Sequence, residues 1–161
     1  MPNGSVTKVS DIDGVMVAVI AAVTSAVNYP VFDGPPTSLP ARTVSQFVAI
    51  GADNIDSAIA DTGLTTDSAR MNQEWHGLGQ VARYEEVTIN CVAVGRADTV
   101  TNARQLALEV VEDVGKNIAL HPTATSYNAL VSAVESVKSQ PTSGGAFVHV
   151  QFVITASTRL T

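Results

Sequence analysis

Residues 86–94 read Glu-Val-Thr-Ile-Asn-Cys-Val-Ala-Val, and apolar and polar side chains alternate along most of this stretch. Val87, Ile89 and Cys91 occupy every second position, with polar residues between them. Because successive side chains of a β-strand point to opposite faces of its sheet, the pattern predicts a strand with one buried face. A β-sheet is therefore expected at the centre of the fold.

Upstream of this strand, three more segments favour extended structure. Residues 31–33 and 44–50 are short, apolar and β-branched, which is typical of strands. Residues 68–79 come just before residues 86–94, and we expect the two segments to form a β-hairpin.

A second hairpin is expected at the C-terminal end. Residues 147–157 alternate almost without a break, so a strand is predicted there. Residues 127–137 are interpreted as its partner strand, although Leu130 and Val134 on the alternate positions leave a helix open as the alternative. The run Pro-Thr-Ser-Gly-Gly at 141–145 predicts the turn between them.

Two segments have apolar residues at three- and four-residue steps, which predicts amphipathic helices at residues 11–27 and 99–120. Candidate caps precede each helix: Ser10 or Asp11, and Thr99 or Thr101. The predicted fold class is α+β: a single domain over residues 1–161 with a mixed or antiparallel central sheet, packed by two main helices and containing β-hairpins. Residues 51–68, rich in aspartate and without periodicity, are expected to be a solvated acidic loop or insertion.

Composition excludes several classes of function. The 161 residues carry 9 Lys and Arg against 15 Asp and Glu, and no basic run, which argues against a protein that grips nucleic acid through phosphates. The single cysteine, Cys91, is expected to be a small buried residue, so neither a disulfide nor a Cys/His metal site is predicted. The sequence begins without a basic, apolar leader, and its longest apolar run is shorter than the ~20 residues of a membrane span. We therefore expect a soluble protein without a secretory signal.

No catalytic motif is found. His76, His121 and His149 are far apart and are interpreted as packed or solvent-facing side chains. The adjacent carboxylates Glu85 and Glu86 point to opposite faces if they lie in a strand, so they make no acid/base pair. The spacing of the aspartates fits no EF-hand loop, and the glycines at 77 and 79 precede a strand instead of opening a helix, as a dinucleotide motif requires. We expect a protein that is not an enzyme and that has no cofactor or metal.

Several segments together carry a resemblance over nearly the whole chain. They are Val31-Phe32-Asp33-Gly34-Pro35-Pro36, Val48-Ala49-Ile50-Gly51, Trp75-x-Gly77-Leu78-Gly79, Glu85-Glu86-x-Thr88-Ile89-x-Cys91, the long second helix, and Gly145-Ala146-x-x-x-Val150-x-Phe152-x-Ile154-x-Ala156 followed by Arg159. In this order they resemble the tail terminator proteins of long-tailed (siphovirus-type) actinobacterial phages. Residues 51–67 are not part of the resemblance.

The resemblance implies a structural virion protein that assembles, in the cytoplasm of the bacterial host, into a homo-oligomeric ring, expected to be a hexamer. Such a ring binds the head-proximal end of the tail tube protein, stops tube polymerisation and offers a docking surface to the head-completion or neck protein. Phage DNA passes through the bore without specific binding. A low charged fraction of 15%, against about 25% in ordinary proteins, suits a surface that neighbouring subunits cover.

Two sets of residues are candidates for a role in such a ring. One is an acidic set for the bore or rim, where carboxylates repel phosphates: Asp53, Asp56, Asp61 and Asp67. The other is a candidate interface set: Trp75, His76, Leu78 and Arg83. Trp75 is the expected anchor because buried aromatic residues dominate contact energies, and an ordinary core position is the alternative for it.

Rival functions stay open at this point. Another neck or head-completion protein, or a tail tube subunit, would also be a structural virion protein. A small-ligand binding protein or an enzyme would need titratable groups that converge in a pocket.

Overall fold

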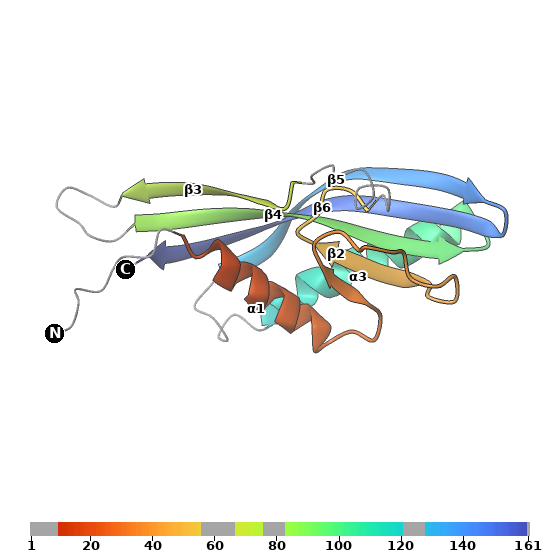
Figure 1. The fold of residues 1–161 in the computed structure, drawn as a ribbon, viewed down its shortest axis with the longest axis horizontal. Coiled ribbons are helices and arrows are strands. Elements are labelled where there is room, and N and C mark those ends of the chain that lie inside the picture. The colour runs from red at the N-terminus through yellow and green to blue at the C-terminus, as the bar shows by residue number, and fades with distance from the viewer. Residues whose placement is uncertain (1–9, 56–66, 76–82, 121–127, 161) are drawn as a thin grey trace.

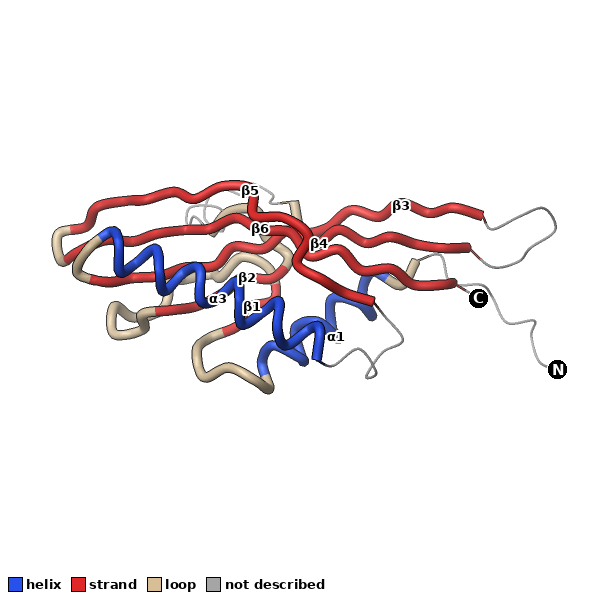
Figure 2. Tube along the Cα trace, turned by 180° about the vertical axis from the view of Figure 1, so that it is seen from behind, coloured by secondary structure: helices blue, strands red, loops and turns tan. Residues whose placement is uncertain are grey.

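The computed structural model describes residues 10–55, 67–75, 83–120 and 128–160. Their elements, in chain order, are α1 (Ile12–Thr24), β1 (Val31–Asp33), β2 (Gln46–Ile50), β3 (Ala69–Trp75), β4 (Arg83–Ala97), α3 (Val100–Leu120), β5 (Asn128–Thr142) and β6 (Gly145–Leu160). The strands form one mixed six-stranded sheet, and both helices cover the same face of it (Figures 1 and 2). The predicted α+β class is confirmed.

The sheet is built around two long strands, β4 and β6, which pair antiparallel from Arg83↔Leu160 to Ala97↔Ala146. The strand order is β1-β2-β4-β6-β5, with β1 and β2 parallel and the other pairs antiparallel. β3 also pairs with β4, at residues 83–89, while β2 pairs with residues 91–95. Because β6 occupies the other side of β4, β2 and β3 follow one another along the same side. Figure 1 shows β3 and the half of β4 that pairs with it extending past α3.

The main core lies between the sheet and the two helices. Val87, Ile89 and Cys91 of β4 are at most 1% exposed on this face, as the alternation predicted. β6 contributes the alternating residues Val148, Val150, Phe152 and Ile154 to the same core. The strand at 86–94 and the C-terminal strand at 147–157 are thus confirmed, and both are longer than predicted.

A second, smaller core lies on the opposite face and contradicts the prediction that β4 buries one face only. Its members are Phe47, Ala49, Ala52, Ile55, Val92, Val94 and Phe147, with Phe32 packed against them. The chain after β2 runs back over the sheet, so Ala52 and Ile55 are almost completely buried. The prediction that the whole of 51–68 is a solvated loop is therefore wrong for Gly51, Ala52 and Ile55, whereas Asn54 between them is exposed. Two apolar side chains among polar ones gave too short a pattern to indicate burial.

The predicted helices are confirmed as α1 and α3. In α1, the Ser10 hydroxyl accepts the Ile12 N–H at 3.1 Å, whereas the Asp11 side chain makes no capping hydrogen bond. In α3, Thr99 Oγ1 accepts the Asn102 N–H at 3.2 Å. α3 approaches β4 closely at Gly95, where a Cβ atom would lie 2.1 Å from the Ala103 carbonyl oxygen.

The C-terminal hairpin is confirmed, and residues 128–142 form a strand, not a helix. Two irregularities in the β5–β6 register place Val131, Val134 and Val137 opposite Ile154, Phe152 and Val150, on the helix-covered face. The bulges lengthen the repeat along β5 from two residues to three. This spacing explains why the segment also fitted a helix.

Candidate functional site

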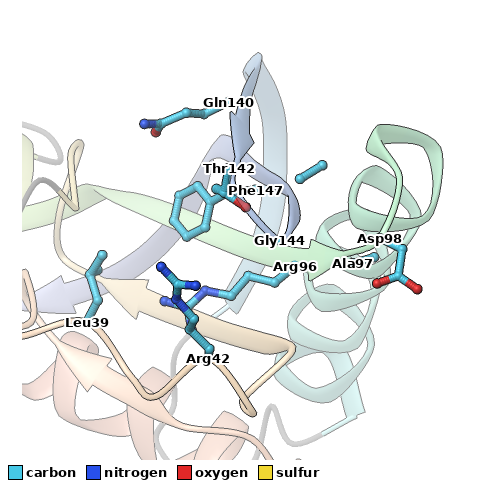
Figure 3. A pocket seen from close by; sticks show the side chains of 10 residues that line it. Leu39, Arg42, Arg96, Ala97, Asp98, Gln140, Thr142, Gly144 and Phe147 are labelled. Atoms are coloured by element: carbon cyan, nitrogen blue, oxygen red, sulfur yellow. The ribbon is translucent and has the colours of Figure 1, made fainter.

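A pocket of about 430 Å³ opens at the end of the sheet where the β5–β6 turn meets the chain between β1 and β2. Its lining residues are Leu39, Arg42, Arg96, Ala97, Asp98, Gln140, Thr142, Gly144, Ala146 and Phe147. Figure 3 shows the side chains of Arg42 and Arg96 converging between Leu39 and Phe147. The pocket thus combines apolar walls with two guanidinium groups.

Arg96 is held in a fixed position near the end of β4. Its Nη1 donates hydrogen bonds to the carbonyl oxygens of Pro40 at 2.9 Å and Ala41 at 2.8 Å. Its guanidinium carbon also lies 5.3 Å from the ring centre of Phe47 and 5.4 Å from that of Phe147, which are cation–π distances. These contacts hold the chain before β2 against the end of β4 and fix the orientation of the guanidinium.

The electrostatic environment of this pocket is cationic. Burial, and then repulsion from Arg42, lowers the pKa of the Arg96 guanidinium. In the described part of the chain neither arginine forms an ion pair, and Figure 3 shows the Asp98 carboxylate directed away from both. An anion bound between the two guanidinium groups would relieve their repulsion and accept charge-assisted hydrogen bonds.

No pattern in the sequence indicated this pocket. Arg42 and Arg96 are far apart in the chain, and neither lies in a basic run or a recognised motif. The parallel pairing of β1 with β2 and the antiparallel pairing of β2 with β4 bring them together.

Of the four predicted acidic residues, the structure places two. Asp53 is half-buried and its backbone carbonyl accepts a hydrogen bond from Gln151 Nε2, while Asp67 has a side chain that is 66% exposed and lies 3.6 Å from Arg70. Asp56 and Asp61 lie outside the described residues.

We call residues 51–67 the acidic segment. Asn90 of β4 forms hydrogen bonds with both of its described ends. Its carbonyl accepts the N–H groups of Gly51 and Ala52, and its side-chain amide donates to the carbonyl of Asp67 at 3.1 Å. Both described ends of the segment are therefore attached to β4 near the junction between β2 and β3.

Of the predicted interface residues, Trp75 and Arg83 are register partners at the end of the β3–β4 pair, which confirms the predicted hairpin. His76 and Leu78 lie outside the described residues.

Glu85 is a buried carboxylate that serves the fold. It is 1% exposed, and its oxygens accept the Asp11 N–H at 2.8 Å and Gln73 Nε2 at 2.5 Å. The first of these bonds joins β4 to the N-terminus of α1, where a helix dipole favours negative charge. Glu86, next to it, is exposed, as alternation along a strand predicted.

The remaining reactive side chains are separated from one another. Burial raises the pKa of the Cys91 thiol to about 12, so the thiolate is not available near neutral pH. His149 packs edge-on against Phe147 at 4.5 Å between ring centres, and burial lowers its pKa. His121 lies outside the described residues. Within the described ranges, no three His, Cys, Asp or Glu side chains are grouped as a metal site would need.

A second unusual surface is the free edge of β5. Along it, Val134 and Val137 on the side of the helices and Leu130 on the opposite face are 45–55% exposed, and Leu108 of α3 is 36% exposed. A long edge strand with exposed apolar side chains is a template for pairing with another chain. We call this strand and its apolar side chains the β5 edge.

None of the helices that the structure describes is long and apolar enough to cross a membrane. No protein-family model matches the chain, and no curated protein matches it.

Proposed function

We propose that this protein is a structural subunit of a phage virion, a tail terminator that assembles into a ring on the head-proximal end of the tail tube. The observation that supports this most is the β5 edge, a 15-residue edge strand with exposed apolar side chains. β1 and β3 lie at the opposite edge of the same sheet. A subunit that uses two different edges can associate head to tail, and such contacts close into a ring when the rotation allows it.

The resemblance supplies the biological context for such a ring. It implies six subunits, a tube protein on one face and a head-completion protein on the other. A tube grows because each ring offers the next one a matching face. The proposed terminator matches the last tube ring on one face only, so growth stops there.

The acidic segment fits this role as the wall or rim of the bore. Asp53 and Asp67 lie near its two ends and are held to the sheet through their backbone carbonyls, Asp53 by Gln151 of β6 and Asp67 by Asn90 of β4. Carboxylates facing a bore would repel the phosphates of passing DNA and prevent its retention.

The test is the mass of the purified full-length chain in solution, measured alone and with purified tail tubes, combined with electron microscopy. We expect one ring per tube end and no further growth. A chain that polymerises alone into long tubes would be a tube subunit, and a ring that binds heads but not tubes would be another neck protein. A stable monomer that ignores tubes contradicts the proposal.

A further inference from the structure

We propose that the pocket around Arg42 and Arg96 binds a carboxylate side chain from a neighbouring copy of this chain. This inference rests on the proposed ring, because the neighbour in that ring is the occupant. The pocket would hold an ion pair between subunits, and its lining includes none of the acidic candidates and none of the predicted interface residues.

The chemistry of the pocket favours a carboxylate as the ligand. The hydrogen bonds that Arg96 makes in the described part of the chain all come from Nη1, which leaves Nη2 and Nε for a ligand. A planar guanidinium presents its donors as a fork that matches the two oxygens of a carboxylate. Arg42 adds a second positive charge, and Leu39 and Phe147 offer apolar surface to the methylene groups of an acidic side chain.

Charge complementarity favours a second copy as the source of that carboxylate. The chain carries a net charge of −6, so a neighbouring copy offers more carboxylates than basic groups. Exposed acids stand at the edge of the sheet opposite β5: Asp33 at the end of β1, Asp67 before β3 and Glu74 within β3.

The position of the pocket fits the same contact. Gln140 and Thr142 of β5 line it, so the pocket lies at the end of the β5 edge. Head-to-tail association would bring the acidic edge of one subunit toward the β5 edge of the next, and with it toward the two arginines.

The experiment compares ring formation on tail tubes, measured by sedimentation over a range of protein concentrations, for three full-length chains. They are the wild type, Arg42→Gln and the control Lys116→Gln. Both substitutions remove one positive charge from an exposed side chain, but Lys116 lies on α3 beside the end of α1 and does not line the pocket. Unfolding in urea checks that each variant is as stable as the wild type.

We expect Arg42→Gln to need about tenfold more protein to form the ring, since charge-assisted hydrogen bonds to a carboxylate are lost. Lys116→Gln should behave as the wild type does. Sodium succinate, as a free dicarboxylate, should inhibit wild-type ring formation more strongly than sodium chloride of the same ionic strength, and should have little additional effect on Arg42→Gln.

Three results would overturn the inference. If Arg42→Gln forms rings as well as the wild type, the pocket takes no part in assembly, although the proposed function stands. If inorganic phosphate competes about tenfold better than succinate, the pocket is built for phosphate groups such as those of nucleic acid. If the wild type forms no ring on tubes, the proposed function itself fails, and the assignment to a second copy fails with it.

Discussion

At the scale of single residues, Arg96 links three parts of the molecule that are distant in sequence. It lies on β4, donates hydrogen bonds to the chain before β2, and stacks against aromatic rings from β2 and β6. In the sequence, Arg96 is a single arginine near the end of a predicted strand, and nothing marks it as a binding or structural residue. Its role depends on strand pairing, which a single sequence does not reveal.

Arg96→Ala should lower the free energy of unfolding by about 2 kcal/mol, because two close backbone carbonyls lose their donor and two cation–π contacts disappear. Urea unfolding of the full chain measures this. Arg104→Ala, which removes an exposed arginine of α3, is the control and should change stability by less than about 0.5 kcal/mol. Equal effects of the two substitutions would contradict the role given to Arg96.

Gly145 is required by the turn between β5 and β6. Its φ angle is +147°, and a Cβ atom there would lie 2.3 Å from the carbonyl oxygen of Ala97. Gly145→Ala should therefore cost about 2 kcal/mol of stability, whereas Gly144→Ala, with no atom within 4 Å, should be close to neutral. Thermal unfolding of the two variants side by side distinguishes them. A neutral Gly145→Ala would mean that the turn adjusts freely.

His149 makes stability depend on pH. Burial, and then the nearby Lys138, lowers its pKa below the ordinary 6.5, so the unfolded chain binds a proton at a higher pH than the folded chain does. Stability should fall as the pH decreases from about 7 through 6.5 toward the lowered pKa of the folded state. Urea midpoints measured between pH 5 and pH 8 should show this loss in the wild type and a smaller one in His149→Gln. The same slope in both proteins would assign the effect to other groups.

At the scale of elements, the predictions were good where one periodicity ran unbroken. α3, β4 and β6 each carry a continuous stripe of apolar residues, and the structure confirms all three. β5 was ambiguous because its two bulges change the repeat from two residues to three. Residues 51–55 were misjudged because a short irregular segment can cover a sheet with only two apolar side chains, Ala52 and Ile55.

The β5 edge leads to a prediction that belongs to this scale. Val134→Lys places a charge on a half-exposed position and should weaken ring formation about tenfold, since a charge at the centre of an interface must be desolvated. Electron microscopy counts capped tube ends. Val17→Lys, on an exposed position of α1, is the matched control and should leave the count unchanged. Normal capping by Val134→Lys would exclude the β5 edge from the interface.

At the scale of the whole molecule, the charge is distributed unevenly. Between residues 53 and 67 the sequence has four aspartates and no lysine or arginine, while the pocket that contains Arg42 and Arg96 lies at the end of the sheet. The acidic segment could be predicted from the sequence because its aspartates are close together along the chain. The pocket could not, because Arg42 and Arg96 are far apart in the chain and come together only in the fold.

Replacing Asp53, Asp56, Asp61 and Asp67 together by Asn should leave ring assembly intact, because these residues are proposed to face the bore or its rim instead of a neighbouring subunit. Mass measurement of the assembled ring and electron microscopy test this. Loss of the ring would make the aspartates structural and would remove them from the bore.

The division of one side of β4 between β2 and β3 has a consequence for motion. In an antiparallel strand, successive amide groups point alternately to the two neighbours. If β3 opens while β6 remains in place, half of the amide protons in residues 83–89 lose their partners and the other half keep theirs. Native-state hydrogen exchange should therefore show fast and slow amides alternating along this half of β4, and uniformly slow exchange along residues 91–95, which are paired on both sides within the main body of the sheet.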